Sequence, residues 1–131
     1  MLEPSRPRVL LADDHAEILR ALTRLLRRAC EVVGTVMDGD ELLDAAIRLA
    51  PDVVVIDLNM PGLNGLENCR RIKSAMPRAQ IIIVTAANDE EVCQEAMRCG
   101  ATAFVFKPRM VEELLSSIEK AMHERALSDR G

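Results

Sequence analysis

The chain of 131 residues is long enough for one domain with a hydrophobic core and too short for two. Apolar residues make up 49% and charged residues 29%, which excludes an intrinsically disordered chain. Its 17 Lys and Arg against 21 Asp and Glu give a net charge of −4, and with two Phe and no Tyr or Trp this argues against a nucleic-acid-binding surface.

Short apolar runs alternate with longer amphipathic segments along the whole chain. Most of the runs are continuous rather than alternating, which is typical of strands buried on both faces of a parallel sheet. The runs are Val9–Ala12, Val32–Val36, Val53–Ile56, Ile81–Val84 and Ala103–Phe106. The amphipathic segments keep the i, i+3, i+4, i+7 spacing of one helix face. Their apolar stripes begin at Ile18, Leu42, Leu66, Val92 and Val111.

Four of these segments open with a short polar residue and a Glu three positions later, a pattern that predicts an N-cap. The pairs are Asp14/Glu17, Asp38/Glu41, Asn64/Glu67 and Asn88/Glu91. Pro51, Pro77 and Gly100 stand where helices are expected to end. Five strand–helix repeats therefore predict one α/β domain over residues 1–131, with a five-stranded parallel sheet and helices on both faces.

Four of the five predicted strands end in a charged or hydroxyl side chain. The first runs into Asp13 and Asp14, the third ends at Asp57, the fourth at Thr85 and the last at Lys107. Ligands of open α/β sheets bind at the carboxyl edge of the strands, near the point where the strand order reverses. We therefore expect these side chains to share one cleft. The second strand ends in no comparable group and is expected at an edge of the sheet.

Three clustered carboxylates predict a divalent cation, because each pair about 4 Å apart repels by on the order of 4 kcal/mol at an effective dielectric near 20. Carboxylate, carbonyl and water oxygens suit a hard ion such as Mg²⁺. With the ammonium of Lys107 and the hydroxyl of Thr85, such an ion meets the needs of phosphoryl transfer. Asp57 is the candidate nucleophile, which would form an acyl phosphate.

Over roughly residues 8–123 the chain resembles a response-regulator receiver domain of the CheY-like kind. The matching motifs are Asp13-Asp14, Asp57 with the following Leu58–Gly65, Thr85-Ala86, and Phe104 with Lys107-Pro108. The run Ala12–His15 is similar to receivers of LuxR-type transcriptional regulators. The resemblance implies a flavodoxin-like fold with strand order 2-1-3-4-5.

The resemblance also implies the chemistry of the site. Asp57 would accept a phosphoryl group from a sensor histidine kinase or a phosphotransfer protein, and the domain would then switch conformation to control an output. Asp13, Asp14, Asp57 and the backbone carbonyl of Asn59 would hold Mg²⁺. Lys107 would pair with Asp57 or with its phosphoryl oxygens.

The resemblance also implies a role in the conformational switch for further residues of the motifs. Thr85, followed by Ala86, would move to hydrogen-bond the phosphoryl group, and Phe104 would turn inward into the space that Thr85 vacates. Plain core packing is the alternative for Phe104. Asn59 and Ala87 flank the site at positions of the kind that set the dephosphorylation rate. The bond between Lys107 and Pro108 is a candidate cis peptide.

The remaining expectations concern the setting of the domain. We expect a cytoplasmic two-component signalling protein that catalyses only its own phosphorylation and dephosphorylation. The apolar runs are too short to span a bilayer, and four cysteines without a C-x-x-C pair are expected to be reduced thiols. We expect no contact of this domain with nucleic acid or membrane, and no output domain within the chain. Homodimerisation, a role in transcription, and a stand-alone or longer protein are left open.

Other functions can be weighed against this one. An Asp-nucleophile, Mg²⁺-dependent phosphatase-like enzyme usually carries a second Asp two residues after the first, where this chain has Asn59. A flavodoxin-like cofactor module needs a loop rich in Ser, Thr and Gly after the first strand, where this chain has Ala12–His15. A phosphorylation-independent interaction module would not need the acidic cluster. His15 is expected to be an exposed residue of the first helical turn rather than a ligand.

Overall fold

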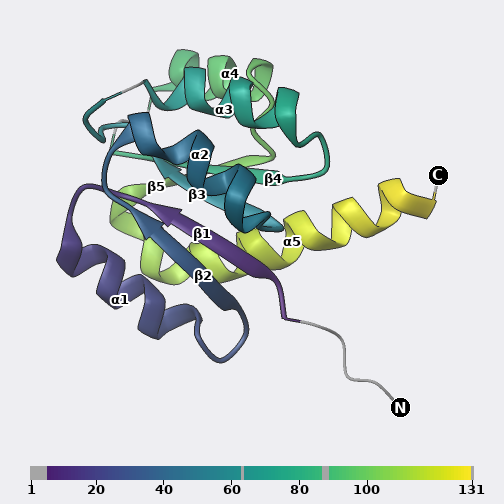
Figure 1. Cartoon of the computed structure of the whole chain (residues 1–131), viewed down its shortest axis with the longest axis horizontal. Helices are drawn as coiled ribbons and strands as arrows, with labels where there is room; N and C mark the ends of the chain where they lie inside the picture. Colours follow the sequence, from purple (N-terminus) through teal and green to yellow (C-terminus); the bar gives the residue numbers. More distant parts are fainter. Residues whose placement is uncertain (1–5, 63, 87–88, 131) are drawn as a thin grey trace.

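Within residues 6–62, 64–86 and 89–130, which the computed structural model describes, five β-strands alternate with five α-helices (Figure 1). The strands are β1 (Arg8–Ala12), β2 (Glu31–Val36), β3 (Val53–Asp57), β4 (Gln80–Thr85) and β5 (Ala103–Phe106). The helices are α1 (Ala16–Leu26), α2 (Gly39–Leu49), α3 (Gly65–Ala75), α4 (Glu90–Arg98) and α5 (Met110–Arg130), with a 3₁₀ turn η1 (Lys107–Arg109) before α5. Each strand lies within one residue of its prediction at either end.

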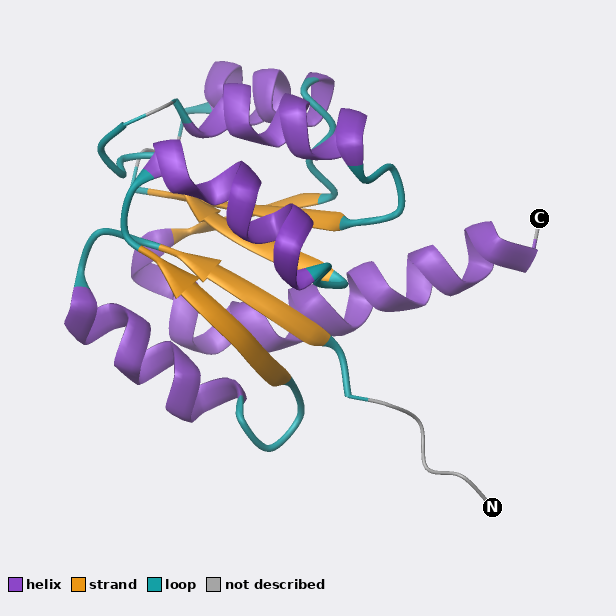
Figure 2. Cartoon of the chain, in the orientation of Figure 1, coloured by secondary structure: helices purple, strands orange, loops and turns teal. Residues whose placement is uncertain are grey.

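The strands form one sheet in the order β2-β1-β3-β4-β5, so β2 and β5 are its edges. All four neighbouring pairs are parallel, as helical crossovers between successive strands require. Figure 2 shows the sheet lying between two layers of helices. The predicted fold class, strand order and edge position of the second strand are therefore confirmed.

Each face of the sheet has its own apolar core, because successive strand residues point to opposite sides. In β4, Ile82 and Val84 belong to the cluster that α1 and α5 cover. Ile81 and Ile83 belong to the cluster beneath α2, α3 and α4. All four side chains are at most 1% exposed, which explains why the run is apolar at every position.

Two of the predicted N-caps are confirmed. The side chain of Asp38 accepts a hydrogen bond from the backbone N–H of Asp40 at 2.7 Å, and that of Asn64 accepts from Leu66 at the same distance. Each cap satisfies a backbone donor that the first turn of the helix leaves unpaired.

The other two predicted N-caps are wrong by one residue. The N-cap of α1 is His15 rather than Asp14, because Asp13 Oδ1 accepts the His15 N–H at 2.8 Å and holds the chain in a turn before the helix begins. The N-cap of α4 is Asp89, whose side chain accepts from the N–H of Glu91. Asn88 lies outside the described residues.

The last helix continues to Arg130, past residue 123, where the resemblance to a receiver domain was expected to end. Two ion pairs connect its final turns to residues beside the opposite, amino-terminal ends of β3 and β4. Arg125 Nη1 lies 3.0 Å from Asp52 Oδ1, and Asp129 pairs with Arg78. None of the helices in the described part of the chain has the length and apolar character needed to cross a lipid bilayer.

The peptide bond between Lys107 and Pro108 is trans, so the expectation of a cis bond at this position is wrong. Pro108 lies in the first turn of η1, directly before α5. Proline is favourable at this position, because its fixed φ matches that of a helical turn. Its lack of an N–H costs no hydrogen bond there, since the N–H groups of a first turn have no acceptor within the helix.

Candidate functional site

Strand register brings Asp13 and Asp57 together at the carboxyl edge of the sheet. Ala12 pairs with Ile56 across β1 and β3, and each aspartate is the next residue along the chain. Alternation points both side chains to the face that α1 and α5 cover, where they lie with Leu11 and Val55. The side chains of Asp13 and Asp57 are only 4% and 1% exposed, so two carboxylates are buried side by side.

Lys107 supplies a positive charge opposite both carboxylates. It follows β5, and its Nζ donates to Asp57 Oδ2 at 2.8 Å and lies 3.3 Å from Asp13 Oδ2. Burial lowers the pKa of Lys107, but the hydrogen bond to Asp57 and the charges of Asp57 and Asp13 outweigh it and raise the pKa above its usual value. The ammonium therefore stays protonated at neutral pH.

The loop after β3 folds back onto Asp57. The backbone N–H of Asn59 donates to Asp57 Oδ1 at 3.0 Å, so each oxygen of this carboxylate accepts a hydrogen bond. The Met60 side chain is buried and the N–H of Met60 donates to the Asp57 carbonyl, which anchors the loop. The Asn59 side chain is left exposed at the mouth of the site.

Asp14 and His15 complete the acidic cluster on its outer side. His15 Nδ1 lies 2.9 Å from Asp13 Oδ1 and 3.0 Å from Asp14 Oδ1. The contact with Asp14 lacks hydrogen-bond geometry, since Asp14 Oδ1 is buried and accepts no hydrogen bond from any described residue. His15 is exposed as expected, but its contacts with two candidate ligands were not predicted. Its position directly after Asp13-Asp14 was the available signal.

The donor set fits a hard divalent cation. One oxygen each from Asp13, Asp14 and Asp57, together with a ring nitrogen of His15, lie within 4.8 Å of one another. Three carboxylates face a single ammonium, and one carboxylate oxygen is buried without a donor. A cation with oxygen ligands would satisfy that oxygen and the excess negative charge, as Mg²⁺ does in carboxylate sites. The predicted convergence of these aspartates and Lys107 is confirmed.

Thr85 lies at the same edge but on the other side of the sheet. It is 4% exposed at the end of β4, and alternation places it with Ile81 and Ile83 on the face of α3 and α4. Together with Asn59 it lines a hollow between the loop after β3 and α4. Ala86, the next residue, is exposed.

Phe104 lies in the edge strand β5 with 44% of its surface exposed. Plain core packing, one of the two predictions for this residue, is therefore wrong. Ala87, which was expected to flank the site, lies outside the described residues.

The sequence of the chain is similar to those of known proteins. Residues 9–119 match the model of the response regulator receiver domain family. The chain is 32% identical over 123 residues to the nitrate/nitrite response regulator protein NarL of Escherichia coli, an alignment that covers 92% of this chain and 55% of NarL. It is 33% identical over 117 residues to the chemotaxis protein CheY of Thermotoga maritima, covering 86% of this chain and 98% of CheY.

Solved structures share the fold closely. A two-component response regulator of the LuxR family from Aurantimonas superposes with a TM-score of 0.86 at 32% identity, covering 92% of this chain and 88% of that one. The response regulator domain of Thermotoga maritima CheB superposes with a TM-score of 0.84 at 34% identity, covering 90% and 97%. The chain spans about half the length of NarL and of a second relative, the response regulator GacA of Pseudomonas aeruginosa.

Proposed function

Because the chain belongs to the response regulator receiver domain family of two-component systems, we propose that Asp57 carries a phosphoryl group and that its phosphorylation switches the domain to control an output. The observation that supports this most is the placement of Asp57. Its carboxylate is 1% exposed, pairs with Lys107 at 2.8 Å and lies within 4.8 Å of two further acidic side chains. A carboxylate needed only for stability gains little from two acidic neighbours.

The phosphodonor would be a phosphohistidine of a sensor kinase or of a phosphotransfer protein. The domain would receive the phosphoryl group from it in the cytoplasm. A carboxylate oxygen of Asp57 attacks phosphorus, the P–N bond breaks, and its electron pair stays on the imidazole nitrogen, which takes up a proton. The product is an acyl phosphate on Asp57. Lys107 remains protonated and can transfer its ion pair from Asp57 to the new phosphoryl oxygens.

Asp13, Asp14, Asp57 and the backbone carbonyl of Asn59 are the groups that would hold Mg²⁺. When bound, the ion supplies the positive charge that the three carboxylates and the incoming phosphoryl oxygens need in common. Asp14 Oδ1 has a free lone pair for this purpose, because no described residue donates to it. His15 would have to give up its contacts with Asp13 and Asp14 to admit a cation on that side.

The conformational response would involve Thr85 and Phe104. Thr85 would donate its hydroxyl to the phosphoryl group beside Ala86, and Phe104 would then turn inward from its exposed position. Burying a ring that is 44% exposed is favourable by the hydrophobic effect, which offsets part of the cost of moving the loop after β4. The exposed surface of β5 would thereby differ between the two states.

The test is intact-protein mass spectrometry after incubation with acetyl phosphate. With Mg²⁺ the mass should rise by one phosphoryl group, and removing the metal with EDTA should prevent it. Asp57→Asn should abolish the gain, whereas Asp44→Asn, a matched change at an exposed position of α2, should leave it intact. Equal labelling of Asp57→Asn would refute the assignment, and sustained turnover of a phosphate ester would favour the phosphatase-like alternative.

A further inference from the structure

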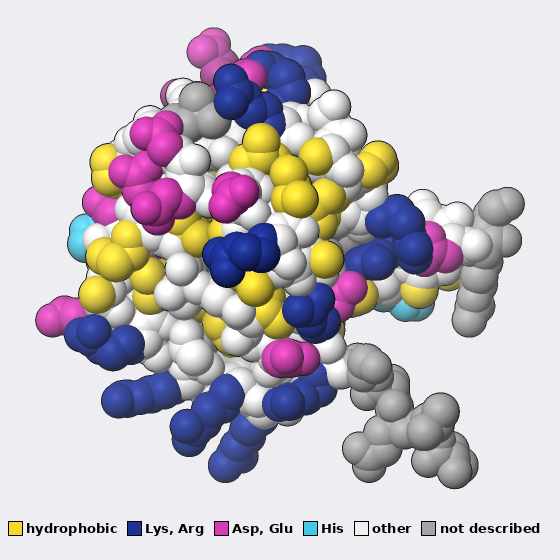
Figure 3. Space-filling view, viewed as in Figure 1, with side chains coloured by type: hydrophobic (Ala, Val, Ile, Leu, Met, Phe, Trp, Pro, Cys, Tyr) yellow, Lys and Arg dark blue, Asp and Glu magenta, His cyan; other side chains and the backbone are white. Residues whose placement is uncertain are grey.

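Helix α1 and the turn after it carry four exposed arginines in nine residues: Arg20 and Arg24 lie in the helix, and Arg27 and Arg28 follow it directly. Within the part of the chain that the structure describes, none of the four guanidinium groups has a hydrogen-bond or ion-pair partner. Most other arginines are paired, for example those of α3 with Glu67 and that of α4 with Glu95. Figure 3 shows basic side chains projecting in a row along the border where Figure 1 draws α1.

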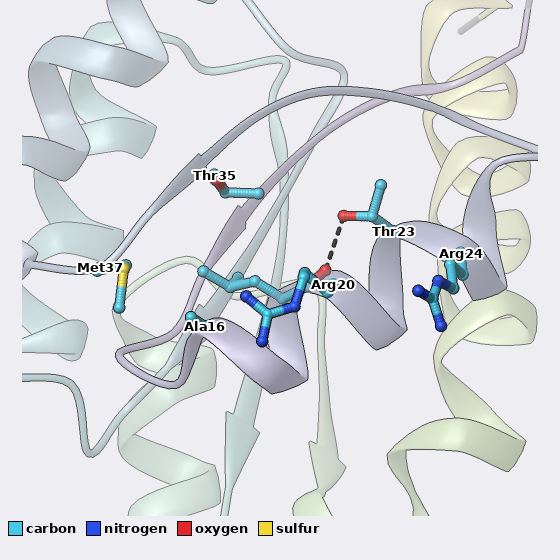
Figure 4. Close-up of a pocket in the computed structure, with 7 residues that line it drawn as sticks. Ala16, Arg20, Thr23, Arg24, Thr35 and Met37 are labelled. Carbon is cyan, nitrogen blue, oxygen red and sulfur yellow. Dashed lines mark hydrogen bonds between the residues drawn. The ribbon is translucent and has the colours of Figure 1, made fainter.

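A hollow of about 460 Å³ lies between this helix and the edge strand β2. Figure 4 shows Thr35 of β2 and Met37, which directly follows the strand, lying across from Ala16 and Arg20 of α1. Met37 is 46% exposed although it is apolar, and the buried side chain of Leu19 also lines the hollow.

Arg20 and Arg24, the two arginines that line the hollow, form no hydrogen bond or ion pair with the residues that the structure describes. Thr23 donates its hydroxyl to the Leu19 carbonyl at 2.7 Å, which Figure 4 draws as a dashed line, so this polar side chain of the lining is satisfied internally. Arg20 and Arg24 have no such contact with any residue that the structure describes. The hollow therefore combines an apolar surface with unpaired cations at its rim.

We propose that this hollow and the four arginines along α1 and the turn after it form a docking site for an acidic, amphipathic segment of a partner protein. Apolar side chains of the segment would cover Leu19 and Met37, and its carboxylates would pair first with Arg20 and Arg24. Because a helix rises about 1.5 Å per residue, Arg20 and Arg24 lie about 6 Å apart along α1, and Arg27 and Arg28 continue the row past its last turn. A single small anion could not reach all four arginines, whereas a polypeptide segment can.

The charge pattern supports an anionic partner of this length. Arg20 and Arg24 are four residues apart on α1, where like charges repel and destabilise the helix. A partner that brings carboxylates between them removes this cost. Nucleic acid is a poorer match, because the chain has a net charge of −4 and its two aromatic residues both lie outside α1 and the hollow.

A fluorescein-labelled synthetic peptide with Leu and Glu at helical spacing is the probe, and fluorescence anisotropy the measurement. Arg20→Glu combined with Arg24→Glu should weaken binding about tenfold or more, and added salt should weaken it in the wild type. The matched control is Arg48→Glu with Lys120→Glu, which makes the same charge change at exposed positions of α2 and α5 and should bind as the wild type does.

Binding should also depend on the hollow and not on charge alone. Met37→Gln should weaken it, a peptide with Ser in place of Leu should bind poorly, and amide NMR shifts should concentrate in residues 16–24 and 35–37. The proposal is overturned if the control pair weakens binding equally, if the Ser peptide binds as well, or if a DNA duplex competes the peptide away. Asp57→Asn should bind normally, so the outcome is independent of the phosphorylation site.

Discussion

Replacing Asp14 by Asn should stabilise the metal-free protein and weaken its response to Mg²⁺. Asp14 is one of three carboxylates gathered within 4.8 Å, and its side chain makes no hydrogen bond within the described residues. The substitution therefore removes repulsion, and the one described contact it alters is the 3.0 Å approach of the exposed His15 ring to Asp14 Oδ1. The ion pair between Lys107 and Asp57 stays in place.

The size of the effect follows from the spacing. Two unit charges 4.8 Å apart repel by about 3.5 kcal/mol at an effective dielectric of 20, and by about 0.9 kcal/mol in bulk water. The Asp14 side chain is 32% exposed, so solvent screens it and the lower part of this range applies. We expect the metal-free variant to gain about 1–2 kcal/mol in free energy of unfolding. With Mg²⁺ at about 100 times its Kd the wild type should gain about 2.7 kcal/mol, and the variant much less.

Urea unfolding followed by far-UV circular dichroism measures both quantities, since the chain has no Trp or Tyr for fluorescence. Each protein is unfolded with EDTA and again with Mg²⁺. Asp44→Asn is the control, because Asp44 is exposed on α2 and the change should shift stability by less than about 0.5 kcal/mol. A metal-free Asp14→Asn variant less stable than the wild type, or equal gains from Mg²⁺, would refute the electrostatic account.

Three further predictions follow from individual contacts. The pKa of Lys107 is raised in the folded protein, so the stability that its charge contributes is fully present below the ordinary lysine pKa of about 10.4 and is lost as pH rises through the folded-state value. Lys107→Met lacks this contribution at every pH. When unfolding is measured at neutral pH and again above about pH 10, the variant should therefore lose less stability between the two conditions than the wild type does. Arg125→Ala should lower the free energy of unfolding by about 0.5–1 kcal/mol and speed hydrogen exchange at the end of α5. Asp52→Ala should lower the free energy of unfolding further, because Asp52 also accepts the Arg8 N–H at 2.9 Å. Equal hydrogen exchange in the wild type and both variants would contradict this. Burial raises the pKa of Cys69 to about 12, so iodoacetamide near pH 8 should modify this thiol only after unfolding. Peptide mass spectrometry measures the modification. Rapid labelling of Cys69 in the native protein would contradict the prediction, because it would require the buried thiol to become exposed.

The sheet and the acidic cluster could be predicted from the sequence because one physical constraint governs both. Strands buried on two faces must be apolar throughout, so a charged residue at the end of such a run is conspicuous. Parallel strands share a carboxyl edge, which brings Asp13, Asp57 and Lys107 together although 44 and 50 residues separate them.

The features that were missed depend on contacts with no periodic signal. Asp13 accepts the His15 N–H and delays the start of α1, and the sequence does not distinguish this turn from a cap by Asp14. The final turns of α5 have no apolar stripe and are connected to the domain by ion pairs with Asp52 and Arg78, far away in the chain. Apolar periodicity ends where those turns begin, so the sequence pattern does not indicate that α5 continues to Arg130.

The central claim is that Asp57 is the residue that carries the phosphoryl group. An acyl phosphate can be trapped by reduction with borohydride, which converts the modified aspartate to homoserine, and peptide mass spectrometry then identifies the position. After treatment with acetyl phosphate and Mg²⁺, we expect homoserine at residue 57 alone. Homoserine at Asp13 or Asp14, or none in folded protein that has bound Mg²⁺, would contradict the assignment.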